Sequence, residues 1–298
     1  MNNRIHSENR RASLAHRLAL APYSVWAVIF VAVPLVFVAY YAFTDESFRF
    51  TTENLTKFFT AVSTITDDSG AAREVHTYLL IFWRSVKLAV ISTAICLLMG
   101  YPIAYIIARA APRTQKTIIT LIMIPMWMNF LLRTMAWQTL LEKNGVINTF
   151  LTMLHLPNIA IINTPAAIIL GMVYNFLPFM VLPIYNTLAK IDDNVINAAR
   201  DLGADNYQTL TKILLPLSVP GIVSGITMVF VPALTTFVIS NLLGGSKILL
   251  IGNVIEQEFT KGSNWNLGAG LSIVLMVFIL LSMTMIAKYD KDGEGSAF

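Results

Sequence analysis

The sequence predicts an all-α membrane protein with six transmembrane helices. Hydrophobic residues make up 56% of the 298 residues and charged residues only 13%, whereas soluble domains carry about 25% charged residues. A helix needs about 20 mostly apolar residues to cross a bilayer, and the chain contains several uncharged runs of at least that length. This composition excludes a disordered chain, a nucleic-acid-binding domain and an ordinary soluble enzyme.

Each expected span follows from an uncharged run. The six predicted spans cover residues 18–44, 88–108, 117–141, 165–188, 216–240 and 267–287. The first run is longer than the ~7–15-residue apolar core of a signal peptide, so we expect a retained helix. The third run is interrupted only by Arg133, and turn signals such as Asn144-Gly145 predict a short surface helix near residues 146–155 before the fourth span.

The placement of Lys and Arg predicts the orientation. Twelve of the 21 positive residues lie on the side of the two termini and eight on the opposite side, with Arg133 inside a span. We therefore expect one membrane domain over residues 18–287, with cytoplasmic tails at residues 1–17 and 288–298. Residues 45–84 are then an outer docking or spacer loop, and residues 190–215 form a cytoplasmic loop.

The chain lacks the residue patterns of several chemistries. It has no Gly-Lys dipeptide, so it has no phosphate-binding loop of the usual nucleotidase type. Its four histidines are scattered and lack metal-ligand spacing, so we expect no catalytic residues, no metal site and no cofactor in this chain. No Asp or Glu falls within the predicted spans, which argues against a carrier driven by an ion gradient.

The 190–215 loop is the most informative stretch for function. Asp192, Asp193 or Asn194 can cap the start of a helix, because a side-chain oxygen there accepts a free backbone N–H. Such a helix predicts one small, smooth face with polar edges, which suits docking into a groove of a soluble partner. The face consists of Ala198, Ala199, Leu202 and Gly203, and its polar edges are Arg200, Asp201, Asp205 and Gln208. A plain surface helix is the alternative.

The same loop resembles a known family. Ala198-Ala199, three residues, Gly203, nine residues and then Ile213-x-Leu215-Pro216 is similar to the Glu-Ala-Ala…Gly…Ile-x-Leu-Pro loop of ABC importer permeases. Asn197 stands where that family usually has Glu. The resemblance implies the type I ABC importer permease fold, with this loop forming a coupling helix that docks on an ATPase subunit.

Further runs resemble the spermidine/putrescine (polyamine) subgroup of these permeases. They are residues 131–137, 171–180, 242–247, 250–256 and Asn264-Trp265, and the resemblance extends over about residues 18–287. It implies half of a translocation pathway in a bacterial plasma membrane, a second homologous permease subunit, an extracellular polyamine-binding protein and an ATPase dimer that holds ATP and Mg²⁺. The alternatives are the same machinery for another small solute, or an ion-gradient-driven secondary transporter.

A polyamine pathway without carboxylates needs aromatic faces and amide oxygens, because both attract cations. The residues that we expect to line it are Trp127, Asn129, Tyr174, Asn175 and Phe179. Asn129 and Asn175 are the stronger candidates, since polar groups in a span are costly unless they bind a partner. Ordinary helix packing is the alternative for the aromatic residues.

Charged residues predict an outer gate. Arg133 and Trp137 are four residues apart and share one helix face, and Arg133 would repel a polycation. We therefore expect Arg133 to pair with backbone carbonyls or with Glu256 or Glu258 of the outer loop. The two glutamates are also candidates to receive the cationic substrate at the mouth of the pathway. The alternative is a solvated loop or a contact with the binding protein.

Overall fold

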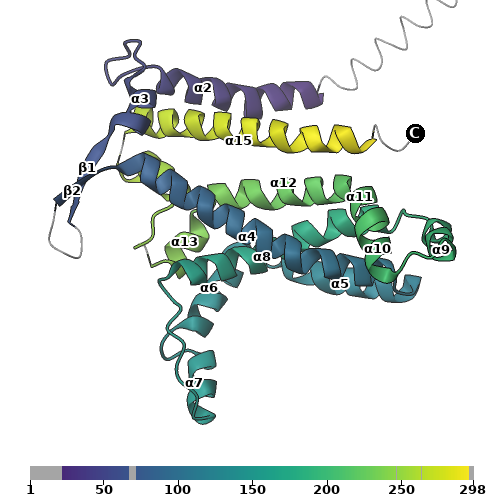
Figure 1. Ribbon diagram of the computed structural model, residues 1–298. Coiled ribbons are helices and arrows are strands. Elements are labelled where there is room, and N and C mark those ends of the chain that lie inside the picture. The colour runs from purple at the N-terminus through teal and green to yellow at the C-terminus, as the bar shows by residue number, and fades with distance from the viewer. Residues whose placement is uncertain (1–21, 67–71, 246, 263, 295–298) are drawn as a thin grey trace, which may run out of the picture. The chain divides into compact units, whose positions relative to one another are not determined.

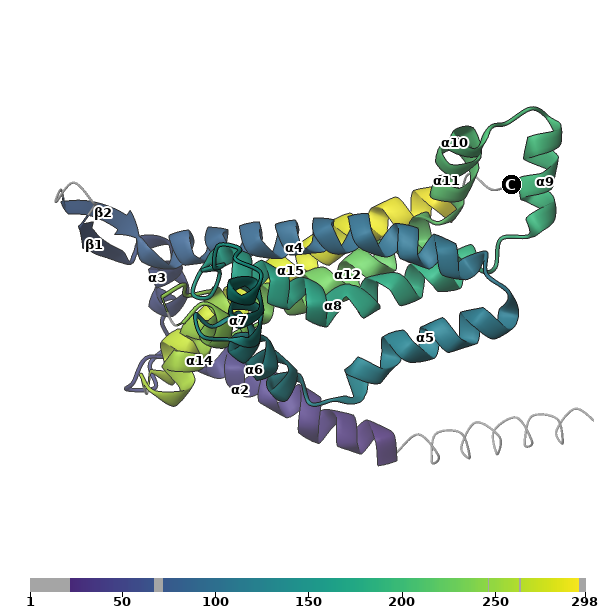
Figure 2. The same cartoon turned by 90° about the horizontal axis from the view of Figure 1, so that it is seen from below.

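The computed structural model describes residues 22–66, 72–245, 247–262 and 264–294, and helices dominate these ranges (Figures 1 and 2). The chain divides into two compact units. The first unit comprises residues 1–60 and 258–275, and the second comprises residues 61–257 and 276–298.

The first unit begins with an apolar helix over Pro22–Ala42, which includes the π-helical stretch η1 (Val28–Ala32) and α2 (Val33–Ala42). Its mean hydropathy is 2.3, and only 6% of its apolar window is buried inside the chain. A helix that is apolar on all sides is typical of a membrane span.

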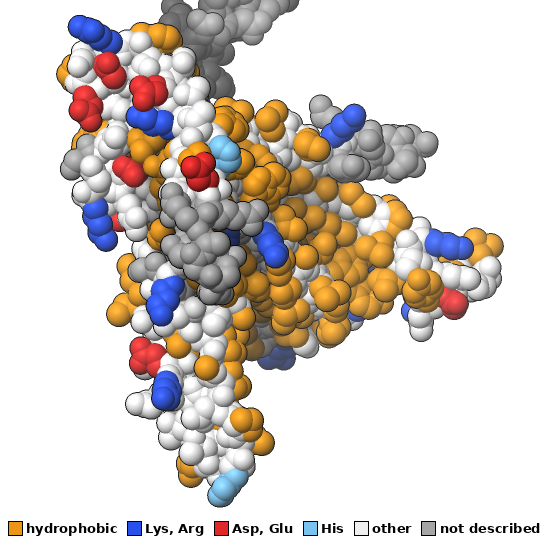
Figure 3. Space-filling view, turned by 60° about the vertical axis from the view of Figure 1, so that its left-hand side comes forward, with side chains coloured by type: hydrophobic (Ala, Val, Ile, Leu, Met, Phe, Trp, Pro, Cys, Tyr) orange, Lys and Arg blue, Asp and Glu red, His pale blue; other side chains and the backbone are white. Residues whose placement is uncertain are grey.

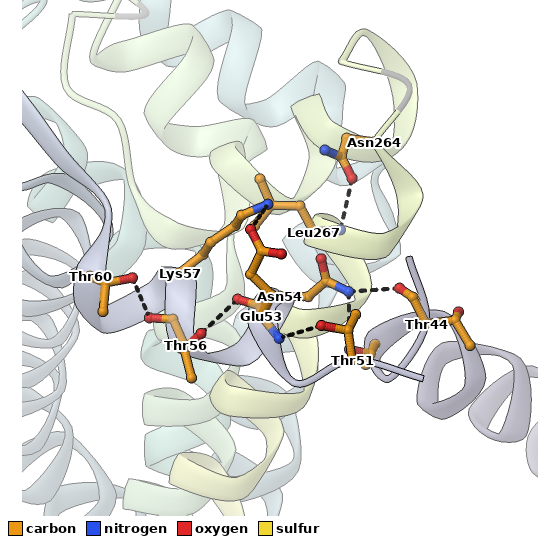
Figure 4. A network of polar contacts seen from close by, with 10 residues as sticks. Thr44, Thr51, Glu53, Asn54, Thr56, Lys57, Thr60, Asn264 and Leu267 are labelled. Carbon is orange, nitrogen blue, oxygen red and sulfur yellow. Dashed lines mark hydrogen bonds and ion pairs between the residues drawn. The ribbon is translucent and has the colours of Figure 1, made fainter. Parts of the chain in front are cut away.

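A buried asparagine organises the connection from α2 to α3 (Glu53–Thr60) (Figure 4). Asn54 is only 5% exposed, and its Nδ2 donates to the Thr44 carbonyl at 2.8 Å. Asn266 in α15 (Trp265–Glu294) donates to the same carbonyl at 2.6 Å. Carbonyls at a helix end have no partner within the helix, so the two asparagines satisfy one and fasten the end of α2 to the start of α15.

Three long helices, α4 (Thr77–Ala108), α8 (Pro165–Leu188) and α12 (Val219–Thr235), form the core of the second unit. They run side by side in Figures 1 and 2. α8 and α12 approach closely at Gly221, where a Cβ atom would lie 2.8 Å from the Pro183 carbonyl oxygen. Residues without a side chain let helix backbones meet in this way.

A hairpin of two strands, β1 (Val62–Thr66) and β2 (Ala72–His76), leads directly into α4. The strands are antiparallel, with Val62 opposite His76. The hairpin lies at the N-terminal end of α4, and α9 (Asp193–Asp201) lies beside its C-terminal end (Figures 1 and 2).

Two of the predicted spans are bent pairs of helices. α5 (Pro112–Trp127) meets the stretch Phe130–Met153, which contains α6 (Phe130–Leu141) and α7 (Val146–Met153), at 90°. The stretch Asn206–Leu217 meets α12 at 66°. The remaining elements are α10 (Asn206–Thr209), η2 (Leu210–Leu214), α11 (Leu215–Leu217), α13 (Val238–Leu243) and α14 (Ile251–Thr260).

The predicted fold class is confirmed. Among the described residues, four helices are individually long and apolar enough to cross a membrane, and the number is six if each bent pair is one span. Hydrophobic side chains cover the helices on the face drawn in Figure 3, with charged side chains toward the margins. The predicted spans over residues 117–141 and 216–240 are not single helices, because the chain breaks at residues 128–129 and again at 236–237.

Candidate functional site

The helix predicted in the 190–215 loop is α9, and both of its ends are capped. The Asp192 side chain accepts the Asn194 N–H at 2.9 Å, which fixes the start. At the other end, the Gly203 N–H donates to the Arg200 carbonyl at 2.9 Å and the Ala204 N–H to the Ala199 carbonyl at 3.0 Å. This pair of bonds is a Schellman motif, which needs a left-handed residue after the helix. Gly203 supplies it with a φ of +87°.

The faces of α9 differ from the prediction in one respect. Ala199 is buried at 8% exposure, together with Ile196 at 7%, so this side of the helix packs against the rest of the chain. Ala198 and Leu202 are exposed, and the exposed fraction of Leu202 is 90%. Ala198 and Ala199 therefore do not share one docking face, because adjacent residues on a helix point about 100° apart and do not face the same neighbour.

The segment after α9 ends at a bend that is held by a hydrogen bond. Asp205 and Gln208 form a capping box that starts α10, and Tyr207 is 74% exposed there. The chain then bends at Ser218, which is fully buried and hydrogen-bonded to the Tyr101 hydroxyl at 3.1 Å. At the start of α9, Arg109 Nη1 donates to Asp193 Oδ1 at 2.5 Å.

The break between α5 and α6 involves two of the predicted pathway residues. The Asn129 side-chain oxygen caps α6 and accepts the N–H groups of Leu131 at 2.8 Å and Leu132 at 3.3 Å. The polarity of Asn129 therefore has a local structural use, although the residue is also exposed. Trp127 ends α5 and is 77% exposed, so its ring is available to a ligand, lipid or partner.

The structure brings α6 and α8 together through aromatic rings. The Trp137 and Tyr174 rings meet edge to face with centroids 5.2 Å apart, which is a favourable geometry. Tyr174 and Phe179 are each 37% exposed. Of the predicted pathway residues, these two present a free aromatic surface on α8, whereas Asn175 is buried at 1% exposure.

Two buried polar groups in this region lack partners among the described residues. Asn175 Nδ2 donates to the Gly171 carbonyl at 2.9 Å, but its Oδ1 accepts no hydrogen bond. Arg133 is 8% exposed, and its Nε and Nη1 have no acceptor. The expected pairing of Arg133 with backbone carbonyls or with a glutamate of the outer loop therefore stays a prediction.

The two glutamates lie on α14, and both are half-buried. The Glu258 side chain lies next to Gly262 and Gly268, where added Cβ atoms would contact it. Burial raises the pKa of the Glu258 carboxyl above its ordinary value of 4.5, because desolvation penalises the charged form. A neighbouring cation would oppose this shift.

The sequence interpretation missed a buried polar network around Asn253. Its Oδ1 accepts from Ser240 Oγ at 2.5 Å and from the Leu250 N–H at 3.0 Å, and its Nδ2 donates to the Phe237 carbonyl at 3.0 Å. Asn253 is fully buried. The network holds the irregular backbone between α12 and α14, and the only signal in the sequence was an asparagine within an apolar run.

Comparison with known proteins agrees with this architecture. Residues 97–291 match the family of binding-protein-dependent transport system inner membrane components. The chain is 36% identical over 275 residues to the spermidine/putrescine transport system permease protein PotB of Haemophilus influenzae, covering 89% of this chain and 91% of the relative. It is also 36% identical to PotB of Escherichia coli, with 87% and 91% covered.

Solved structures show the same fold at lower sequence identity. A bacterial ABC transporter involved in the import of the acidic polysaccharide alginate superposes with a TM-score of 0.76 at 17% identity, covering 99% of this chain and 100% of the other. The alginate transporter in complex with its pentasaccharide-bound periplasmic protein gives 0.71 at 17% identity, with 95% and 96% covered. The chain therefore belongs to the binding-protein-dependent transport system inner membrane component family and is a multi-pass ABC importer permease of the PotB type.

Proposed function

We propose that this chain is the permease subunit of an ATP-driven importer of the polyamines spermidine and putrescine. The observation that carries the proposal is the 36% identity to PotB over about nine-tenths of both chains. The subunit is non-catalytic. It forms half of the translocation pathway, and ATP and Mg²⁺ bind in a partner ATPase.

The proposed assembly has four kinds of component. A second, PotC-like permease completes the pathway, a PotA-like ATPase dimer supplies the energy, and a PotD-like binding protein delivers the polyamine from outside. Both termini and α9 face the cytoplasm in this arrangement, whereas the hairpin at the other end of α4 faces outward. The excess of Lys and Arg in the short loops at the α9 end supports this orientation.

The exposed side of α9 is the proposed ATPase contact. Leu202 is 90% exposed, Tyr207 is 74% exposed and Val195 is 44% exposed. Large apolar side chains this exposed near a charged loop are typical of a protein contact. The predicted coupling residues Asn197, Ala198, Arg200 and Asp201 are also exposed beside them. Ala199 and Gly203 act differently, by packing α9 onto the chain and by ending it.

The proposed pathway follows the exposed aromatic residues. Trp127, Tyr174 and Phe179 present ring faces, each of which attracts a cation by about 0.5–2 kcal/mol. The unpartnered Asn175 oxygen offers an acceptor for a polyamine N–H group. Arg133, Trp137 and the α14 glutamates are the proposed gate, at which Glu256 and Glu258 attract the cation.

Reconstitution tests the proposal directly. The chain is co-expressed with its homologous permease, ATPase and binding protein, and the purified complex is inserted into proteoliposomes. We expect uptake of radiolabelled spermidine or putrescine that requires ATP and the loaded binding protein. Uptake by this chain without the ATPase would support a gradient-driven carrier, and stimulation only by a different solute would reject the polyamine assignment.

A further inference from the structure

One face of α4 holds both ends of the segment that contains α9. Tyr101, Tyr105 and Arg109 are spaced four residues apart, so they share one face at the C-terminal end of α4. The Arg109 guanidinium lies 6.0 Å from the centre of the Tyr105 ring, within cation–π range. The three side chains therefore form a continuous stripe along the last two turns, which we call the α4 stripe.

The two end residues of the α4 stripe contact opposite ends of the 193–218 segment. Arg109 bonds to Asp193, the first residue of α9. The Tyr101 hydroxyl forms a hydrogen bond with Ser218, at the bend before α12. Ser218 Oγ already donates to the Leu215 carbonyl at 3.0 Å, so the Tyr101 hydroxyl is the donor to Ser218. Tyr101 and Arg109 are only about 12 Å apart along α4, although the residues that they contact, 193 and 218, are far apart in the sequence.

Both contacts are made by the C-terminal two turns of α4. Pro102 lies within the helix, where it removes one backbone hydrogen bond and lets the helix bend against its preceding turn. Tyr101 directly precedes Pro102, and Arg109 lies seven residues beyond it. The 193–218 segment and the last two turns of α4 are therefore tied into one body, and this body continues into a helix that packs against α8 and α12.

The Arg109–Asp193 ion pair is expected to position α9 without contributing much to the stability of the fold. The Asp193 side chain is 81% exposed and that of Arg109 is 23% exposed. An ion pair whose carboxylate is this exposed contributes only about 0–1 kcal/mol, and Arg109 Nε and Nη2 are buried without an acceptor among the described residues. Loss of the ion pair should therefore leave folding and assembly intact and change mainly how α9 is held. We propose that Tyr101 and Arg109 are positioning residues that transmit the ATPase-driven displacement of the 193–218 segment into α4; this rests on the function proposed above.

The test compares single substitutions in the intact four-component complex. Arg109→Gln removes the charge and Arg109→Lys retains it. Arg113→Gln is the matched control at the nearby start of α5, where Arg113 is exposed. We expect normal recovery of the complex with every variant. In Arg109→Gln the ATP hydrolysed per polyamine transported should rise about fivefold or more, the usual scale of a coupling energy, while Arg109→Lys and Arg113→Gln stay near wild type.

The second contact is tested with a double-mutant cycle of Tyr101→Phe and Ser218→Ala, each of which removes only a hydroxyl. The effects on the coupling ratio should be non-additive if the two groups act through one bond. Wild-type coupling in both Arg109→Gln and Tyr101→Phe would overturn the inference. So would loss of the ATPase from these complexes, because that outcome indicates a docking role.

A readout independent of the transported solute separates the two proposals. Backbone hydrogen exchange in residues 193–201 should be faster in Arg109→Gln than in Arg113→Gln, because Arg109→Gln removes the ion pair between α9 and α4. Unchanged exchange contradicts the inference even if polyamine transport is demonstrated. If the wild-type complex does not transport polyamines but the exchange difference between Arg109→Gln and Arg113→Gln is observed, only the proposed substrate is contradicted.

Discussion

Leu202 gives the sharpest prediction about the proposed ATPase contact. Its side chain is 90% exposed, so it contributes little to the fold of this chain. Leu202→Ala removes three carbon atoms, and full burial at an interface is worth about 0.8 kcal/mol per methylene group. The substitution should therefore weaken docking by about 2 kcal/mol, or ~30-fold in Kd.

The assay is titration of the purified ATPase onto the permease pair in nanodiscs. Met153→Ala is the matched control, because Met153 is 76% exposed but lies on α7. Leu202→Ala should leave the melting temperature unchanged while Kd rises, and Tyr207→Ala should show the same pattern. An unchanged Kd for both α9-side variants, or a similar loss with Met153→Ala, refutes the reasoning.

Four further predictions use other features of the chain. Gly203→Ala should destabilise the end of α9 by about 1 kcal/mol, because φ is +87° there, and Gly203→Asn should cost less; hydrogen exchange of α9 measures both. Gly221→Ala should lower the melting temperature, since its Cβ would lie 2.6 Å from Thr187 Oγ1, and overpacking costs about 1–3 kcal/mol. Arg133→Ala should reduce uptake about tenfold, equivalent to ~1.4 kcal/mol, with normal assembly on gel filtration; recovery of an unassembled complex would reject a gating role. The raised pKa of Glu258 means that protonation favours the folded state. That stabilisation is present below the ordinary pKa and lost as the pH rises through the raised value, so Glu258→Gln should raise the melting temperature at pH 8 but not at pH 4.

The boundaries that the sequence predicted well are those with a cap. The fourth span was expected at residues 165–188, and α8 is Pro165–Leu188 with Thr164 as its N-cap. The second span was expected to begin at Leu88, but α4 begins at Thr77. Arg84 and Lys87 end the uncharged run in the sequence, yet both are exposed within the helix. Long cationic side chains can extend away from an apolar helix face, so charge alone does not mark a helix end.

The helix breaks were harder to predict. An uncharged run has the same composition whether its helix is straight or bent, so hydropathy cannot locate a bend. The local chemistry at residues 125–129 was available: Pro125 disrupts the ladder of backbone bonds and Asn129 is a favourable N-cap. The position of Ala199 on the buried side of α9 could not be predicted, because it depends on what the rest of the chain places beneath the helix.

The asparagines in apolar spans can now be divided by whether their polar atoms are satisfied. Bent backbone within a membrane must find its hydrogen bonds inside the protein. The Asn129 oxygen meets that need at the start of α6, and the Asn253 amide meets it at the Phe237 carbonyl. Their polarity is explained by the bends. Asn175 Oδ1 has no donor among the described residues, so its desolvation is uncompensated there. A donor from water or from a polyamine N–H group would remove that cost, which makes Asn175 a stronger candidate than Asn129 for contact with the transported cation.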